Sequence, residues 1–125
     1  MSTLKEIAKQ GNAPDRSTGE RAVPNRITCA DGFSLSVIAG PGNYCSPRPA
    51  LLPNLPADLA NDAPADYPGP YTAVEVGFPS ARPEPWADWL EYVEDPDDPT
   101  ATVYGYVPVE TVQALIELHG GESRA

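Results

Sequence analysis

Hydrophobic and polar residues alternate most clearly over residues 25–40, where two short runs flank the Asp31-Gly32 pair. An Asp-Gly pair in this setting is the strongest local cue for a β-hairpin, because a type I′ turn needs positive φ at both central residues. The apolar positions form one face and the serines the other, so the pattern predicts one buried face and one solvent-exposed face. The apolar positions are Ile27, Cys29, Phe33, Leu35 and Val37.

The same period of two predicts two further strands. Residues 71–78 carry valines at alternate positions and end in Phe78, which is expected to share their face. Residues 101–107 place Tyr104 and Tyr106 on one face, with valines and a glycine on the other. Both stretches are therefore expected to add to the sheet begun by the hairpin.

Three stretches carry helical signals. Residues 3–10 are predicted as a short helix that Ser2 or Thr3 can cap and that a glycine ends. Residues 85–94 begin with a proline, which suits the first helical position, and their apolar residues share one face. Residues 108–120 end at Gly120, a suitable left-handed stop. The apolar positions of the last two helices are Trp86, Trp89, Leu90 and Val93, and Val109, Val112, Leu115 and Ile116.

This order of elements predicts an α+β fold with an approximately four-stranded, mostly antiparallel sheet and one or two packed helices. Residues 1–24, a short helix and a linker rich in glycine, proline and charge, are predicted as an irregular N-terminal arm, and residues 25–125 as a single small acidic domain. Residues 41–70 hold eight of the sixteen prolines and are predicted as a surface loop. Leucines that could pin this loop to the core are Leu51, Leu52, Leu55 and Leu59.

The net charge is −10, and it is unevenly distributed. Residues 1–26 have a net charge of +2, whereas residues 27–125 carry three basic and fifteen acidic residues. Phosphate contacts need lysine and arginine, so we expect no direct binding to nucleic acid or to anionic membranes. No apolar run approaches the ~18 residues of a membrane span, and the N-terminus lacks the apolar region of a secretory signal. We therefore expect a cytoplasmic protein.

No motif for catalysis or metal binding is evident. His119, the sole histidine, lies in the last turn of a predicted helix, where it complements the helix dipole, and nothing in the sequence pairs it with a carboxylate or a nucleophile. Cys29 and Cys45 are expected to be reduced packing residues, with a disulfide as the alternative, and their spacing does not suit zinc. The acidic run at 94–98 lacks the glycine and terminal glutamate of a calcium loop. We expect no enzyme, no metal and no cofactor.

The remaining indication of function in the sequence is an acidic surface flanked by aromatic residues. No lysine or arginine occurs between Arg82 and Arg124, and seven acidic residues crowd into residues 84–98, with tyrosines nearby. Aromatic residues beside carboxylates suit the recognition of a basic protein surface. In the alternative interpretation, the tryptophans are core residues and the acids form a solvated face. The predicted interaction surface comprises Glu75, Glu84, Asp88, Glu91, Tyr92, Glu94, Asp95, Asp97, Asp98, Tyr104 and Tyr106.

Several blocks of residues 25–121 resemble a family of small uncharacterised proteins of bacteriophages and prophages, many from actinobacterial hosts. The blocks are NRITCADGFSLSVIAG, VEVGFPSARPEPW, TVYGYVPVE and LIELHGG. No functional residue of that family can be transferred to this chain. The resemblance implies a phage product that works in the host cytoplasm or is packed in the virion.

Three functions follow as hypotheses. The first is a phage-encoded acidic accessory protein for host takeover or anti-defence, which binds a basic host protein and inhibits a nucleic-acid-handling or defence complex by charge mimicry. The second is a minor structural component of the virion, with the basic arm lying on a neighbouring subunit. The third is a small-ligand-binding protein or enzyme, which requires a pocket lined by Tyr104, Tyr106 and Glu75, with Cys29 or His119 as a further candidate for the lining. The sequence does not define an oligomeric state.

Overall fold

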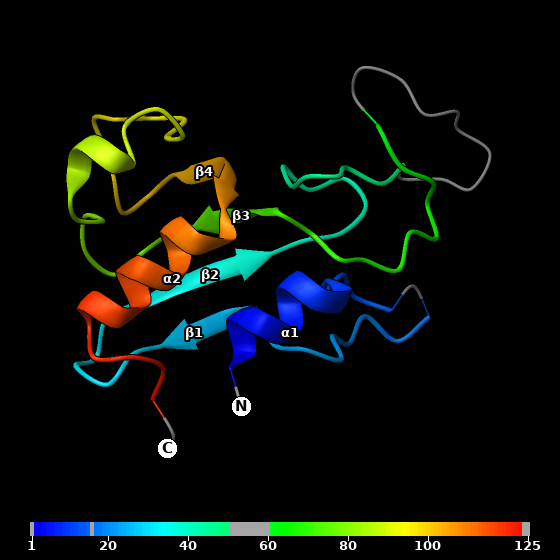
Figure 1. The fold of residues 1–125 in the computed structure, drawn as a ribbon, viewed down its shortest axis with the longest axis horizontal. Coiled ribbons are helices and arrows are strands. Elements are labelled where there is room, and N and C mark those ends of the chain that lie inside the picture. The colour runs from blue at the N-terminus through cyan, green and yellow to red at the C-terminus, as the bar shows by residue number, and fades with distance from the viewer. Residues whose placement is uncertain (1, 16, 51–60, 124–125) are drawn as a thin grey trace.

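The computed structural model of the 125-residue chain describes residues 2–15, 17–50 and 61–123 (Figure 1). The elements are α1 (Thr3–Gln10), β1 (Arg26–Thr28), β2 (Ser34–Ile38), β3 (Ala73–Gly77), the 3₁₀ helix η1 (Trp86–Asp88), β4 (Val103–Pro108) and α2 (Val109–Leu118). The strands form one antiparallel sheet in the order β1-β2-β3-β4, and α1 and α2 lie side by side on one of its faces. The predicted α+β fold is confirmed.

The hairpin of β1 and β2 forms where the alternating pattern placed it, with Ile27 opposite Leu35. Its turn differs from the predicted type I′ form. The Gly32 amide donates to the Cys29 carbonyl oxygen at 3.0 Å, and in this turn only Gly32 has a positive φ, of 96°. A turn followed by one left-handed glycine also matches the twist of two antiparallel strands, so the Asp-Gly signal indicates the hairpin without fixing the turn type.

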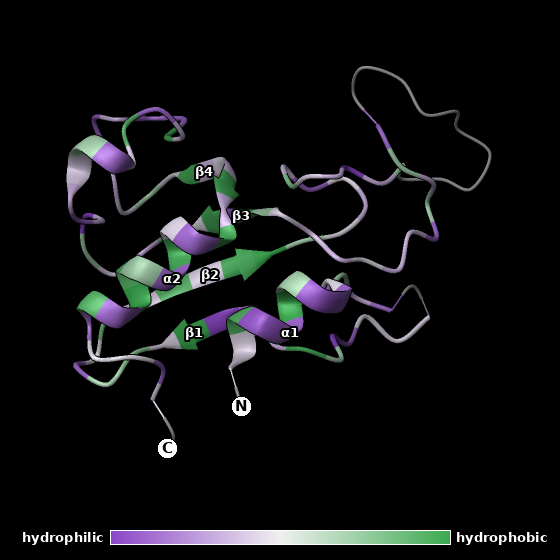
Figure 2. Cartoon of the chain, viewed as in Figure 1, coloured by the Kyte–Doolittle hydropathy of each residue, from purple (hydrophilic) through white to green (hydrophobic). Residues whose placement is uncertain are grey.

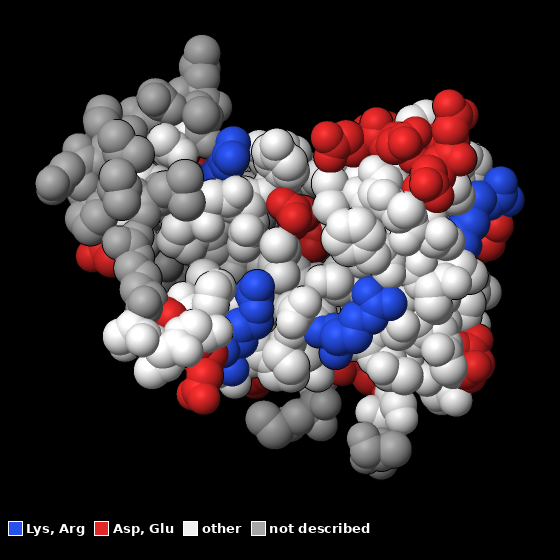
Figure 3. Space-filling model, turned by 180° about the vertical axis from the view of Figure 1, so that it is seen from behind, with Lys and Arg blue, Asp and Glu red and all other residues white. Residues whose placement is uncertain are grey.

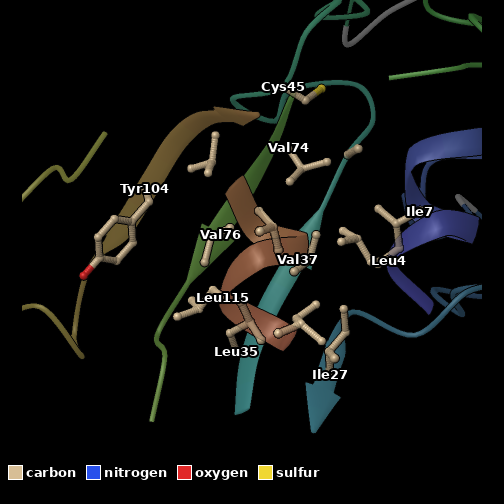
Figure 4. Close-up of a cluster of buried hydrophobic side chains, with 14 of the residues drawn as sticks. Leu4, Ile7, Ile27, Leu35, Val37, Cys45, Val74, Val76, Tyr104 and Leu115 are labelled. Carbon is tan, nitrogen blue, oxygen red and sulfur yellow. The ribbon is translucent and has the colours of Figure 1, made fainter. Parts of the chain in front are cut away.

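The hydrophobic core lies between the sheet and the two helices. Both helices carry green, apolar positions (Figure 2), and their buried residues are Leu4 and Ile7 of α1 and Val112, Leu115 and Ile116 of α2. Leu4 and Ile7 point from α1 towards Val37 of β2, and all three side chains are fully buried (Figure 4). Burial of each leucine or isoleucine contributes about 1.5–3 kcal/mol, which offsets the marginal stability of an eight-residue helix. α1 therefore belongs to the core of the domain and not to an arm outside it.

The connection between α1 and β1 is anchored by a buried asparagine. The Asn12 amide nitrogen donates to the Val37 carbonyl oxygen at 2.8 Å, and its amide oxygen accepts from the Ala39 backbone N–H at 3.0 Å. Gly11 has φ 73°, and a Cβ there would lie 2.7 Å from the Ala39 carbonyl oxygen. Only glycine permits this approach, which holds the predicted linker against the end of β2.

A β-bulge corrects the predicted faces of the last strand. Val74 lies opposite Val107 and Val76 opposite Tyr104, so that Gly105 and Tyr106 together oppose a single residue of β3. The extra residue reverses the alternation. Tyr104 therefore points into the core and is fully buried, whereas Tyr106 is 47% exposed and has φ 56°. The prediction that both tyrosines share one face is wrong.

The helix predicted over residues 85–94 is also wrong, because only the single turn η1 forms there. The Glu94 amide donates to the Val103 carbonyl oxygen, and the Gly105 amide donates to the Tyr92 carbonyl oxygen. These bonds pair the chain with the free edge of β4. A short helix followed by prolines would stabilise the segment less than this pairing does. Trp89 is buried against the core, but Leu90 is 50% exposed.

The end of β3 and the proline-rich loop also differ from the predictions. Phe78 was expected to share the valine face of β3, but it follows the end of the strand with φ 47° and is 54% exposed. In the proline-rich loop, Cys45 and Ala63 are buried, and residues 46 and 49 form isolated bridges to residues 73 and 63. The predicted pinning residues Leu51, Leu52, Leu55 and Leu59 lie outside the described residues.

Candidate protein-binding surface

Two adjoining grooves border the segment that connects β3 to β4. We name them the helix groove, of about 460 Å³, between this segment and α2, and the strand groove, of about 370 Å³, between the segment and β4. Glu91 and Tyr92 line both grooves. The helix groove brings Glu84, Asp88, Glu91 and Glu110 around Pro85, Ala87, Ala114, Leu115 and Leu118. The strand groove is lined by Tyr44, Glu91, Tyr92, Glu94, Val103, Gly105 and Tyr106.

The helix groove draws its carboxylates from two separate elements. Glu84 precedes η1 and Asp88 is its last residue, whereas Glu110 stands in the first turn of α2, where a negative charge is favourable near the helix N-terminus. Arg82 donates to the Glu84 carboxylate at 2.8 and 3.0 Å, and this contact lowers the pKa of the carboxyl group. Sequence reasoning missed Glu110, because only the fold places the start of α2 across this groove from η1.

The strand groove is built on the bulge of β4. The Tyr106 amide donates to the Tyr44 carbonyl oxygen at 2.9 Å, and the two rings lie 5.9 Å apart. The Tyr44 amide in turn donates to the Glu75 carboxylate at 2.9 Å, which places Glu75 beside the groove. A Cβ at Gly105 would lie 3.1 Å from the Tyr44 Cβ, so the glycine allows the close approach. Sequence reasoning missed Tyr44, which lies in the irregular loop.

The three remaining acids, Asp95, Asp97 and Asp98, form an exposed turn next to the grooves. The Asp97 amide donates to the Asp95 carboxylate, and the Asp95 amide donates to the Thr102 hydroxyl. Figure 3 shows acidic side chains gathered at one upper corner of the molecule, over the connection between β3 and β4. These aspartates extend the negative surface but line neither groove.

Tyr104 does not belong to the surface. Its hydroxyl donates to the Pro99 carbonyl oxygen at 2.6 Å, and Trp86 and Trp89 contact its ring edge to face, with centroid distances of 6.4 and 5.6 Å. Burial raises the pKa of Tyr104 to about 12. This aromatic cluster supports the grooves from beneath, and the pocket expected between Tyr104, Tyr106 and Glu75 does not form, because Tyr104 faces the core.

The grooves are negatively charged. No lysine or arginine is among the residues that line either groove. The pKa of Tyr92 is raised, first by burial and then by the charges of Glu91, Asp88 and Glu110. Within the described part of the chain, the arginines that come near are both engaged with aromatic rings: Arg48 lies over Tyr44 and Arg82 over Trp86.

His119 gains a partner that the sequence did not indicate. Its Nδ1 lies 2.7 Å from a carboxylate oxygen of Asp31, across 88 positions of the chain, and its ring stacks on Phe33 at 3.9 Å. The Asp31 pKa is lowered by the Phe33 amide and then by His119. The His119 Nε2 is buried and has no hydrogen-bond partner among the described residues, so no nucleophile is placed against it. The pair locks the hairpin turn to the end of α2.

Neither cysteine is in a disulfide, and both are buried. The Cys45 thiol lies within hydrogen-bond distance of the Gly40 and Pro47 carbonyl oxygens, and burial raises the pKa of both thiols. Across residues 2–15, 17–50 and 61–123, no group of three or more histidine, cysteine and acidic residues is arranged to hold a metal ion. In the same part of the chain, no helix has the length and apolar character that crossing a bilayer requires.

No protein-family model, no curated protein and no solved structure matches this chain. The surface must therefore be interpreted from its own chemistry.

Proposed function

We propose that this protein is a small binding protein that receives a basic segment of a partner protein in the helix groove and the strand groove. The observation that carries this proposal is the convergence of carboxylates from η1, the following turn and α2 around a partly apolar floor, with no basic residue in the lining. Interfaces of this composition, with aromatic residues at the centre and charge around them, suit a partner of opposite charge.

Like charges that converge destabilise the folded chain through mutual repulsion. Glu84, Asp88, Glu91 and Glu110 surround a single groove, and of these only Glu84 has an ion-pair partner among the described residues. A basic partner would remove this repulsion on binding. Its positive charges would also be steered towards the groove over distances of about one Debye length.

The resemblance to phage and prophage proteins suggests where the partner is found. We propose a host protein of the bacterial cytoplasm, from a complex that handles nucleic acid or acts in defence. The phosphate-binding surfaces of such proteins are rich in lysine and arginine. Occupation of that basic surface by the carboxylates of this protein would block access of the nucleic acid.

The other two hypotheses receive less support. The virion hypothesis relied on a free basic arm, whereas Leu4 and Ile7 fix α1 in the core. The enzyme hypothesis required a pocket that included Tyr104, which is buried. Mass spectrometry of purified particles of a phage that encodes this chain tests the virion hypothesis directly.

A fluorescence titration with a labelled lysine- and arginine-rich peptide tests the proposal. We expect binding that weakens steeply when the ionic strength rises from about 0.1 M to about 1 M, because the Debye length falls from about 10 Å to about 3 Å. The double variant E91Q/E94Q should bind several-fold more weakly, since Glu91 lines both grooves.

The matched control is E6Q/E20Q, which changes the net charge by the same amount at residues that line neither groove. Equal weakening by both double variants would show that only net charge matters and would contradict a specific surface. Absence of binding to the peptide at low salt would also reject the proposal.

A further inference from the structure

Two arginines of this chain show how the surface holds a guanidinium group. The Arg82 guanidinium lies over the Trp86 ring at 5.3 Å from its centroid and donates to the Glu84 carboxylate at 2.8 Å. The Arg48 guanidinium lies over the Tyr44 ring at 5.0 Å. Guanidinium groups bind aromatic faces and carboxylates together because they are planar and weakly hydrated.

Arg48 covers the Tyr44 ring at the border of the strand groove, and the rest of the groove lining presents the same two kinds of group without an arginine. Tyr92 and Tyr106 supply aromatic rings, and Glu91 and Glu94 supply carboxylates. Burial raises the pKa of the Tyr92 phenol, and the charges of Glu91, Asp88 and Glu110 raise it further, which is consistent with a site that attracts a cation.

The backbone of Tyr106 supports a role for its ring. A φ of 56° is unusual for a bulky residue, and glycine would adopt this conformation without steric conflict. The conformation nonetheless presents a tyrosine that is 47% exposed at the wall of the groove. Strained positions of this kind occur where the side chain serves binding.

From these observations we infer that the strand groove binds a single arginine side chain of the partner, with its guanidinium against the Tyr92 and Tyr106 rings and its N–H groups donating to Glu91 and Glu94. This inference rests on the proposed function and makes it more specific. Lysine offers a compact, strongly hydrated charge and no planar fork, so the groove should prefer arginine at equal peptide charge.

The test compares an arginine-rich peptide with a lysine-rich peptide of the same length and charge. We expect the arginine peptide to bind roughly threefold to tenfold more tightly. We also expect it to shift the ring signals of Tyr92 and Tyr106 in a ¹H–¹³C NMR spectrum. The Y106L variant, in which leucine meets the same backbone strain as tyrosine, should remove the preference and leave salt-dependent binding of the lysine peptide.

A second variant, E94Q, keeps the test decisive if Y106L does not fold, and it should weaken the arginine peptide more than the lysine peptide. The control E110Q, in the helix groove only, should weaken both peptides equally. Equal binding of the two peptides to the wild-type protein would overturn the arginine site and leave the proposed function standing. Failure of both peptides to bind would overturn the proposed function as well.

Discussion

The carboxylate of Glu122 accepts a hydrogen bond from the Leu4 backbone amide at 3.1 Å, although 118 positions separate them in the chain. The same carboxylate accepts from the Ser2 hydroxyl at 2.8 Å and from the Thr3 amide at 2.9 Å. The first amides of a helix have no partner within the helix, and the helix dipole favours a negative charge at this end. The C-terminal tail thus caps α1, and the two ends of the described chain are held together.

Replacement of Glu122 by glutamine should lower the free energy of unfolding by about 1–2 kcal/mol, the usual contribution of a helix-capping side chain with charged hydrogen bonds. Urea denaturation followed by circular dichroism measures this loss. The control E117Q changes an exposed glutamate whose carboxylate contacts Gln113, and it should change the stability by less than about 0.5 kcal/mol. Equal effects of the two variants would contradict the capping role.

The stability of the wild-type protein should fall as the pH drops below the ordinary glutamate pKa. Burial raises the pKa of Glu122, but the hydrogen bonds donated by Leu4, Ser2 and Thr3 lower it more, so that it lies below its ordinary value of 4.5. A lowered pKa in the folded state stabilises the fold fully above pH 4.5, and this contribution is lost as the pH falls through the folded pKa. The stability difference between wild type and E122Q should therefore shrink on acidification; a difference that stays constant would contradict this linkage.

A core position of α1 tests whether the N-terminal helix is part of the domain. The L4A variant should lose about 2–5 kcal/mol, because Leu4 is fully buried and its removal leaves a cavity. The matched control is L90A, the same change at a side chain that is 50% exposed, where a loss below about 1 kcal/mol is expected. A free arm would instead leave L4A as stable as the control.

At the bulge residue Tyr106, glycine should give a more stable protein than alanine, which reverses the usual order of these two residues. Both Y106A and Y106G remove the ring, but only glycine adopts φ 56° without a Cβ conflict. Y106G should therefore be about 1 kcal/mol more stable than Y106A in chemical denaturation. An alanine variant that is the more stable of the two would show that this backbone conformation does not persist in solution.

Local pattern predicted the elements whose hydrophobic residues follow a regular period. The hairpin, β3 and α2 follow directly from alternating or helical spacing, and Gly120 ends α2 with φ 91° as expected. The segment after Pro85 was misassigned, because pairing with β4 outweighs a weak helical preference. The reversal between Tyr104 and Tyr106 arises from one inserted residue, which no hydrophobic period reveals.

The candidate surface was predictable in its charge and not in its geometry. The density of acids at 84–98 and the absence of nearby basic residues identify the acidic region from the sequence alone. Tyr44 joins it only through its hydrogen bond with Tyr106 of β4, and Glu110 only because the fold places α2 and η1 around the same groove. The pairing of Asp31 with His119 arises in the same way. Such pairings depend on the complete topology, and spacing along a single sequence does not encode them.

Chemical-shift mapping with the lysine- and arginine-rich peptide tests the central claim most directly. The backbone amide signals of residues 84–94, 103–106 and 110–118 should move on titration, because these residues form the two grooves, and the movements should diminish at high salt. Signals of α1 and β1 should stay in place. Shifts spread evenly over the molecule, or confined to α1 and β1, would contradict the assignment of the two grooves as the binding surface.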